Sequence, residues 1–445
     1  MITRIEVDGF KSLNGFRFDV QPGLNILVGP NGAGKTNIIL FFEFVSKLIS
    51  EDLYNAVTKV GGAGAIFKKV GDRDHTNTIT CTIQGCRKVK DKYIKYEYQF
   101  SIDISFDKDS IFFSKQSYRA GIVDSFSQDS SYDAWGLIIT QSQTDKQSKP
   151  TVLLEKVDTK VFSGRLGVTT AKVTEADVMK QYERFFKDFN PRVTSLVRAA
   201  FILGEQNYMV YQDLLGGETF NIIPSKVKQP ADSANPPGIK KDGSGLANTL
   251  YAMKKDRRQM HYGFPYFFEE TPIEYDKATL QRIKDNIKLA NRAIVNIDVD
   301  NDQFSNQLLV KVYLKGEDRE TVLPLSAMSD GTIKWITLIT AILTSRELFS
   351  IEEPENFLHP WMQAEIVKIM RSTFHSKSDH AFAIMTTHSE SLLNYSTPEE
   401  VVITRMENGK TIVSRVANQQ QLREEIQRTG FGLGYYYFSN ALDNE

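Results

Sequence analysis

The strongest chemical pattern in the sequence is a glycine-rich run that ends in a lysine and a threonine. It reads Gly29-Pro-Asn-Gly-Ala-Gly-Lys35-Thr36 and fits the spacing GxxxxGK[ST] in full. Glycines let the backbone turn tightly, so that successive N–H groups point at one anion at the start of a helix. The lysine would place a cation on the β- and γ-phosphates of a nucleotide, and the threonine hydroxyl would bind Mg²⁺. The run predicts a phosphate-binding loop whose contacts come from Asn31, Gly32, Ala33, Gly34, Lys35 and Thr36.

A second pattern is a pair of carboxylates at the end of an apolar strand. Leu348-Phe-Ser-Ile is followed directly by Glu352 and Glu353. In nucleotide-hydrolysing sites one acid holds the metal through water, and the next polarises the attacking water. Paired glutamates are usually a solvated turn, but a phosphate loop upstream and a parallel strand favour the functional interpretation. We therefore expect Glu352 to hold Mg²⁺ and Glu353 to act as general base.

Two weaker patterns accompany them. Ser329-Asp-Gly331-Thr stands just before a predicted helix, and by itself it is an ordinary helix cap. His388 follows a predicted strand over 381–385, where it would hydrogen-bond the γ-phosphate or position water. A lone histidine is more often structural, so only its place beside the expected site favours this role.

The elements that position these residues can be predicted from periodicity. A buried strand over 24–28 and an amphipathic helix over 34–49 flank the loop. Residues 76–154 alternate mostly with period two, which predicts an antiparallel sheet. A middle segment of about 172–298 carries helical patterns. The C-terminal part alternates helix and strand and predicts a parallel sheet, from the helices 332–344 and 360–374 and the strands 348–351 and 381–385.

The order of these motifs resembles the head of ATP-binding-cassette (ABC) ATPases. More closely it is similar to the RecF/SMC-type branch, which includes the overcoming-lysogenisation-defect (OLD) ATPases and ATPases of bacterial defence systems. The likeness covers about 1–170 and 300–445. It rests on Phe10-Lys11-Ser12, the phosphate loop, Ser329-Asp-Gly-Thr, Ile351-Glu-Glu-Pro-Glu-Asn-Phe-Leu-His-Pro, Thr387-His388-Ser389 and Thr429-Gly-Phe-Gly-Leu-Gly-Tyr.

The resemblance implies an α/β fold of three parts. Lobe I (1–170) would hold the phosphate loop and an antiparallel β subdomain. An α-helical insertion would occupy 171–300, and lobe II (301–445) would be a parallel α/β unit. Two heads would sandwich two molecules of ATP with Mg²⁺, so that hydrolysis requires a dimer.

Residue roles also follow from the resemblance. Lys11 and Ser12 would approach the phosphates, and His388 would be the switch histidine. Ser329 and Gly331 would close on the γ-phosphate bound by the second copy, although Ser-Asp-Gly replaces the common Ser-Gly-Gly. The metal-contacting glutamine stays open between Gln84 and Gln99.

Composition limits the classes of protein that remain. The chain has 445 residues, 41% hydrophobic and 24% charged, with a formal charge of −1, which excludes a disordered chain and a globally basic nucleic-acid coat. The two cysteines, Cys81 and Cys86, are expected to be structural and favour a reducing cytoplasm. No stretch approaches eighteen consecutive apolar residues, so no membrane partner is expected.

The favoured function is a cytoplasmic ATPase head that controls a separate effector, a nuclease or toxin, in anti-phage defence. A DNA-repair ATPase that clamps DNA, and an ATP-bound scaffold that sequesters a toxic partner, remain alternatives. Two basic runs, beginning at Arg87 and at Lys254, are either DNA or RNA contacts or solvated faces. The aromatic cluster at 435–438 is either core or a docking patch. The sequence has no sustained heptad pattern, so we expect no coiled-coil arm. We also expect no nuclease domain after His388, because that segment is too short.

Overall fold

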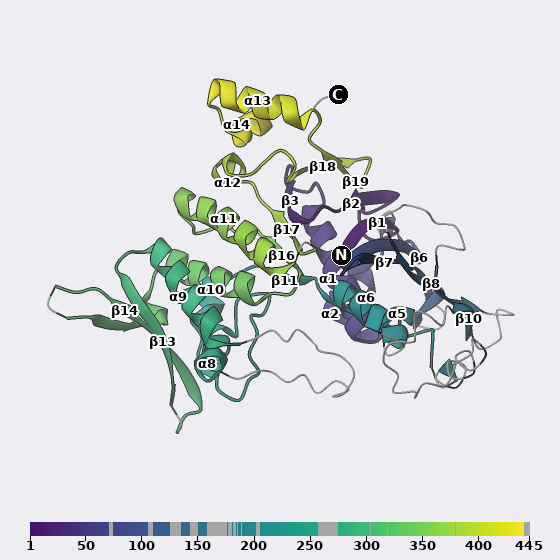
Figure 1. The fold of residues 1–445 in the computed structure, drawn as a ribbon, viewed down its shortest axis with the longest axis horizontal. Helices are drawn as coiled ribbons and strands as arrows, with labels where there is room; N and C mark the ends of the chain where they lie inside the picture. The colour runs from purple at the N-terminus through teal and green to yellow at the C-terminus, as the bar shows by residue number, and fades with distance from the viewer. Residues whose placement is uncertain are drawn as a thin grey trace.

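The computed structural model describes most of the chain (Figure 1). The described ranges are 1–70, 74–105, 110–124, 135–142, 150–157, 189–201, 205–256 and 275–439, without positions 303, 318 and 379, and with a few isolated positions between 176 and 187.

A six-stranded sheet forms the centre of the molecule. Its order is β11 (Glu218–Phe220), β16 (Leu348–Glu352), β17 (Phe382–Thr386), β3 (Gly23–Val28), β18 (Val401–Glu407) and β19 (Lys410–Arg415). All neighbours pair in parallel except β18 and β19, which form an antiparallel hairpin. The predicted parallel sheet is confirmed. Because β17 lies between β3 and β16, the loops that follow these three strands meet at one edge.

The central sheet divides the core into two halves by the alternation of its side chains. Leu27, Phe382 and Ile384 point into one cluster with α1 (Lys35–Ser50) and the antiparallel sheet. Their neighbours at 26, 28, 383 and 385 point into a second cluster with α10 (Asp330–Thr344) and α11 (Pro360–Lys377). Side chains on both faces of a parallel strand are buried, which explains the nearly continuous apolar runs in the sequence.

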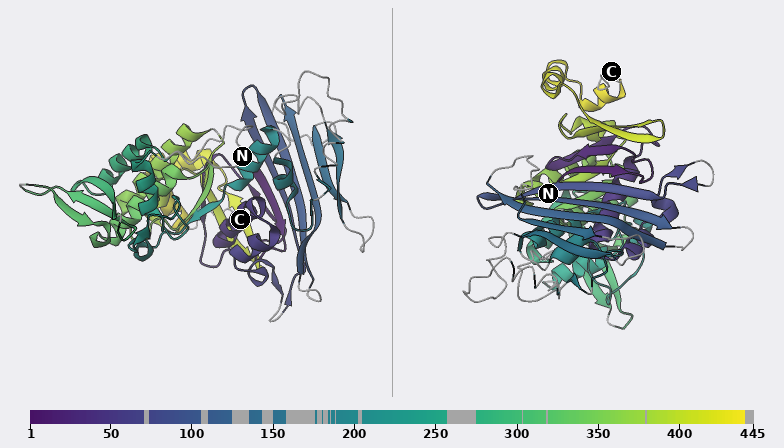
Figure 2. Two further views of the ribbon diagram at one scale, coloured as in Figure 1. Left: turned by 90° about the horizontal axis from the view of Figure 1, so that it is seen from below. Right: turned by 90° about the vertical axis from the view of Figure 1, so that its right-hand side faces the viewer.

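The predicted antiparallel sheet is also confirmed, and it forms one end of the molecule (Figure 2). Its apolar face packs against α1, while its other face is polar. The strand order is β10 (Thr151–Val157), β9 (Leu137–Ser142), β8 (Ser110–Val123), β7 (Lys92–Ser105), β6 (Thr78–Val89), β1 (Ile2–Asp8) and β2 (Phe16–Asp19).

The middle of the chain is helix-rich, but it also contributes strands. Strand β11 joins the central sheet, and β12 (Ala231–Asp232) pairs with β14. The three-part division of the chain stays a prediction, and the helical pattern of 177–186 lies largely outside the described residues. Helices of this region are α5 (Leu196–Ala200), α6 (Glu205–Leu215), α7 (Pro224–Val227), α8 (Leu246–Lys254) and α9 (Lys277–Ala290).

Smaller elements complete the fold. Near the opposite end of the molecule, β14 (Gln307–Leu314) pairs with β13 (Ile294–Asp302) and β15 (Thr321–Pro324) (Figures 1 and 2). The remaining elements are α2 (Leu53–Lys59), α3 (Ala63–Ile66), β4 (Lys69–Val70), β5 (Asp74–His75), the 3₁₀ turn η4 (Leu325–Ala327), α12 (Glu390–Asn394), α13 (Gln419–Thr429) and α14 (Leu433–Phe438).

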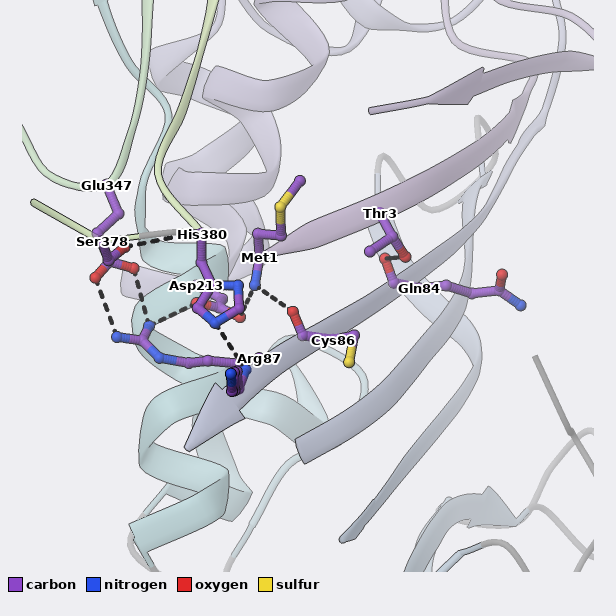
Figure 3. Close-up of polar contacts among 10 residues, drawn as sticks. Met1, Thr3, Gln84, Cys86, Arg87, Asp213, Glu347, Ser378 and His380 are labelled. Carbon is purple, nitrogen blue, oxygen red and sulfur yellow. Dashed lines mark hydrogen bonds and ion pairs between the residues drawn. The ribbon is translucent and has the colours of Figure 1, made fainter. Parts of the chain in front are cut away.

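A buried ionic network joins the antiparallel sheet to the central sheet (Figure 3). Asp213 on α6 accepts from Arg87 on β6 at 2.7 Å and from the Met1 ammonium at 2.7 Å. Arg87 also pairs with Glu347, just before β16, at 3.0 Å. Burial by itself would raise the pKa of Asp213, but the Met1 ammonium and Arg87 more than offset it and hold the pKa below its usual value. We call Arg87, Asp213 and Glu347 the sheet-joining network.

Two further sequence predictions can be compared with the structure. Cys81 and Cys86 are buried free thiols whose pKa values are raised by burial. Within the described ranges, no helix has the length and apolar character that crossing a membrane requires.

Candidate nucleotide site

The glycine-rich run forms a tight loop between β3 and α1, as its spacing predicts. Gly34 precedes the helix with φ 97°, in the left-handed region. A Cβ at Gly34 would come within 1.9 Å of the Thr411 hydroxyl oxygen, and a Cβ at Gly29 within 2.1 Å of the Thr404 carbonyl oxygen. The loop is therefore a cradle that only glycine allows at these positions, and it opens at the N-terminus of a 16-residue helix.

Lys35 lies inside this cradle. Its side chain is buried, and Nζ donates to the carbonyl oxygens of Gly29 at 2.7 Å and Pro30 at 3.1 Å. Burial lowers the pKa of Lys35, and the negative charges of Glu353 and Glu355 act in the opposite direction. Asn31, Gly32 and Thr36 are exposed at the mouth, whereas Ala33 is buried.

The first hairpin reaches the loop through Ser12. Its hydroxyl pairs with the Thr411 hydroxyl at 2.6 Å and accepts from the Asn37 side chain, on α1, at 2.7 Å. Since Thr411 also packs against Gly34, Ser12 lies beside the phosphate loop. Lys11 precedes it in a left-handed conformation, with φ 48°.

The two predicted acids stand at the end of β16 but have different surroundings. Glu353 has a left-handed backbone with φ 43°; its N–H donates to the Thr386 carbonyl at 3.1 Å, and its carboxylate accepts from Asn356 at 2.9 Å. Burial raises the pKa of Glu352, which Lys241 opposes. The two carboxylates whose charge acts on Lys35 are Glu353 and Glu355. The metal and base roles given to Glu352 and Glu353 stay predictions.

Glu355 is a residue of the site that the sequence analysis missed. One carboxylate oxygen accepts from the Thr387 hydroxyl at 2.9 Å and from the His388 N–H at 2.7 Å. The other oxygen is buried and has no hydrogen-bond partner among the described residues. Glu355 thus ties the loop after β16 to the loop after β17. The available signal was the third glutamate in the run Glu352-Glu-Pro-Glu355.

His388 and Ser329 are both exposed and have few contacts of their own. The contact that His388 makes with the acids is through its backbone N–H, which donates to Glu355. Ser329 caps α10 by accepting from the Thr332 N–H at 3.3 Å. A Cβ at Gly331 would come within 2.6 Å of the Phe357 carbonyl oxygen, so the start of α10 packs against the loop that carries the acids.

Lys334 is the second residue that sequence reasoning missed. It lies on α10, is 1% exposed, and its Nζ donates to the Glu353 carbonyl oxygen at 2.9 Å. Burial lowers its pKa to about 8, and the charges of Glu355 and Glu353 oppose that shift. The signal was a single lysine within the otherwise uncharged stretch from 331 to 344.

Other predicted candidates are not brought to the site by any described contact. Gln84 and Gln99 both donate to Glu97, at 3.0 Å each, on the polar face of the antiparallel sheet. A cavity of about 460 Å³ on that face, lined in part by Gln99, shares no residue with the phosphate loop.

Two protein-family models match parts of the chain. A family model described as "AAA domain" matches residues 4–149. A second, described as "AAA domain, putative AbiEii toxin, Type IV TA system", matches residues 182–394.

Solved SMC heads resemble the chain more loosely. One, bound to the C-winged helix domain of ScpA, has 12% identity and a TM-score of 0.48, covering 94% of this chain and 99% of its own. The head from Thermotoga maritima has 10% identity and a TM-score of 0.38, covering 93% and 98%. The head from Pyrococcus furiosus, with an extended coiled coil and bound to the C-terminal domain of ScpA, has 13% identity and a TM-score of 0.43, covering 96% and 99%.

The two family models include the phosphate loop and the acid-tipped strand, and the fold places both at one edge of a parallel sheet. Over both segments the chain is therefore similar to AAA-domain proteins.

Proposed function

We propose that the chain binds ATP·Mg²⁺ at this site and hydrolyses it when two copies close on the nucleotide. The observation that carries the proposal is the meeting of three loops at one sheet edge. The phosphate loop follows β3, Thr387 and His388 follow β17, and Glu353 and Glu355 follow β16, with Lys35 between the carboxylates and the loop carbonyls.

The residues present fit a nucleotide with its metal. The glycine cradle offers backbone N–H groups to an anion, and the buried oxygen of Glu355, which has no hydrogen-bond partner among the described residues, is an acceptor that a polar ligand or water would satisfy. Thr36 and Glu352 would hold Mg²⁺, which supplies charge neutralisation on the phosphate oxygens. Lys35 would exchange its two carbonyl partners for phosphate oxygens.

Water activation falls to the acids in this proposal. Glu353 would accept the proton of the attacking water, while Glu355 fixes the backbone of His388, whose imidazole would face the γ-phosphate. The Asn356 side chain, bonded to the Glu353 carboxylate, would hold the base in place. Lys11 and Ser12 would border the phosphates from the first hairpin.

A second copy is part of the proposal because Ser329 is exposed. Its hydroxyl is at the N-terminus of a 15-residue helix and is bonded to Thr332 of the same turn. Ser329 and Gly331 would therefore serve the nucleotide of the partner copy, as the dipole and free N–H groups of a helix start favour an anion.

The partner controlled by the head is proposed to be a separate nuclease or toxin in anti-phage defence. The support is the description of the family that matches 182–394, which names a toxin and a toxin–antitoxin system. A head that controls an effector predicts turnover that DNA does not stimulate, whereas a DNA clamp predicts DNA-stimulated turnover.

The hydrolysis proposal is tested by phosphate release and by mass from light scattering, with and without ATP·Mg²⁺. We expect the wild type to turn over ATP and Glu353→Gln to lose at least ~100-fold of kcat while doubling its mass with ATP, because binding is kept and the base is lost. Glu320→Gln, which changes an exposed glutamate just before β15, should behave as wild type. Tight ATP binding without turnover in the wild type would instead support the scaffold alternative.

A further inference from the structure

A buried lysine connects α10, the helix that Ser329 caps, to the loop that carries the proposed base. Lys334 lies in the second turn of α10, five residues after the helix cap Ser329. Its side chain is among the largest fully buried ones in the described part of the chain. Burying an ammonium is costly, and an apolar side chain of the same size would fill the space without that cost. Its hydrogen bond to the Glu353 carbonyl oxygen is therefore the contact to explain.

The loop at the other end of this bond has an unusual backbone. Glu353 and Phe357 both have left-handed conformations, with φ 43° and 68°. Non-glycine residues keep such conformations only where surrounding contacts hold them, and they concentrate at functional sites. We call residues 353–357 the base loop.

Two of the contacts that hold the base loop meet at one oxygen, while Glu355 also ties the loop to Thr387 and His388. The Glu353 carbonyl accepts from Lys334 Nζ at 2.9 Å and from the Asn356 N–H at 3.3 Å. Asn356 in turn donates its side-chain amide to the Glu353 carboxylate at 2.9 Å. The Lys334 ammonium also lies 5.9 Å from the centre of the Phe357 ring. Lys334 therefore contacts both left-handed residues of the loop.

The same helix reaches the expected contact with a second copy. Ser329 is its exposed cap, and Gly331 packs against the Phe357 carbonyl oxygen. Because residues of one helical turn move together, a displacement of the cap shifts Lys334 as well.

We propose that Lys334 is a positioning residue that holds the base loop to α10, so that engagement of Ser329 by a second copy sets the position of Glu353. The expected effect on ATP turnover rests on the proposed function. The contact between Lys334 and the base loop does not depend on it. In each copy of the dimer, the position of Glu353 would then depend on whether Ser329 at the start of α10 contacts the second copy.

The test compares Lys334→Met with wild type and with Thr340→Val, a change at another buried polar side chain of α10. Thr340 bonds the Ile336 carbonyl within its own helix and has no described contact with the base loop. Two readouts are needed: amide hydrogen exchange of the peptide spanning 352–358, without nucleotide, and the kcat and KM of ATP turnover. If Lys334→Met does not fold, Lys334→Gln serves instead, because its uncharged amide is one bond shorter and removes the ammonium from the Glu353 carbonyl oxygen.

We expect Lys334→Met to exchange the base-loop amides at least ~10-fold faster, with β16 and β17 unchanged. We also expect kcat to fall at least ~10-fold while KM changes less than ~2-fold, because nucleotide binding does not use Lys334. Thr340→Val should change neither readout. Unchanged loop exchange overturns the inference, and so does faster exchange with kcat equal to that of Thr340→Val. If the wild type itself shows no turnover, the proposed function fails, and loop exchange alone still decides whether Lys334 holds the loop.

Discussion

At the scale of single residues, the site is an arrangement of four charges in a poorly solvated setting. Lys35 and Lys334 are both buried, and for both the pKa is lowered by burial and raised by Glu353 and Glu355. The carboxylates therefore offset part of the lowering that burial causes in the pKa of both lysines. The negative charges of Glu353 and Glu355 would also repel the phosphates of a nucleotide bound at Lys35. They would therefore weaken nucleotide binding, although they would assist hydrolysis.

This balance predicts that Glu355→Gln binds ATP more tightly. The amide oxygen would still accept from Thr387 and His388, but the negative charge beside Lys35 would be gone. We expect the Kd of ATP to fall by about 3–10-fold, since one like-charge interaction in partly solvated surroundings is worth roughly 1 kcal/mol. Calorimetric titration with ATP·Mg²⁺ measures this, and Glu320→Gln is the matched control. Weaker binding by Glu355→Gln would show that Glu355 contacts the metal or its water instead.

At the scale of elements, the sheet-joining network connects three segments far apart in the chain. Arg87 on β6 pairs with Asp213 on α6, 126 residues away, and with Glu347, 260 residues away. His380 joins it at the edge, accepting from the Lys88 N–H at 2.8 Å, and its pKa is lowered by burial. These contacts set the antiparallel sheet against the start of β16 and β17, so they orient the strands whose far ends carry the acids and His388.

We expect Asp213→Asn to lower the free energy of unfolding by about 3–5 kcal/mol at pH 7, because a buried partner of Arg87 is lost. Since the pKa of Asp213 is depressed in the folded chain, its contribution is present above the unfolded pKa of about 4 and is lost as pH falls through the folded value. The difference between the two proteins should therefore shrink below pH ~4.

Urea unfolding at several pH values measures this difference. Glu51→Gln, at an exposed pair with Lys59, is the control and should change the free energy of unfolding by less than about 1 kcal/mol. A gap between wild type and Asp213→Asn that stays constant down to pH ~3 would contradict the role of the ionised carboxylate.

At the scale of the whole molecule, several basic residues that could contact nucleic acid are paired with carboxylates of the chain itself. Lys254 pairs with Asp298 and Asp300, and Arg87 belongs to the sheet-joining network. Lys228, which follows α7, and Lys241 pair with Asp330 and Glu43. Arg257 and Arg258 lie outside the described residues. The aromatic cluster near the C-terminus divides, with Tyr436 buried and Tyr435 and Phe438 about half exposed.

These pairings predict that duplex DNA does not stimulate the head. At about 150 mM salt we expect added DNA to change ATP turnover by less than ~2-fold, because Arg87, Lys254, Lys228 and Lys241 are already paired with carboxylates of the chain. Turnover with and without a 50-base-pair duplex, repeated at several salt concentrations, measures this. Stimulation that falls steeply as salt rises would favour the DNA-clamp alternative over control of an effector.

The sequence by itself determined the phosphate loop, its flanking strand and helix, and the parallel and antiparallel character of the two sheets. These features depend on residues close together in the chain, where spacing and side-chain periodicity decide the local conformation. Gly34 and Lys35 are recognisable because the chemistry of the loop permits few substitutes.

Only the tertiary structure decided which carboxylates act on Lys35, that Glu355 accepts from the His388 N–H, and that Lys334 donates to the Glu353 carbonyl oxygen. It also showed Gln84 and Gln99 bonded to Glu97 and Arg87 to Asp213. Each of these contacts joins segments whose proximity follows from the order of strands in a sheet or from helix packing. Local pattern does not carry that information, because the direction of a side chain depends on the neighbour it meets and not only on its own position.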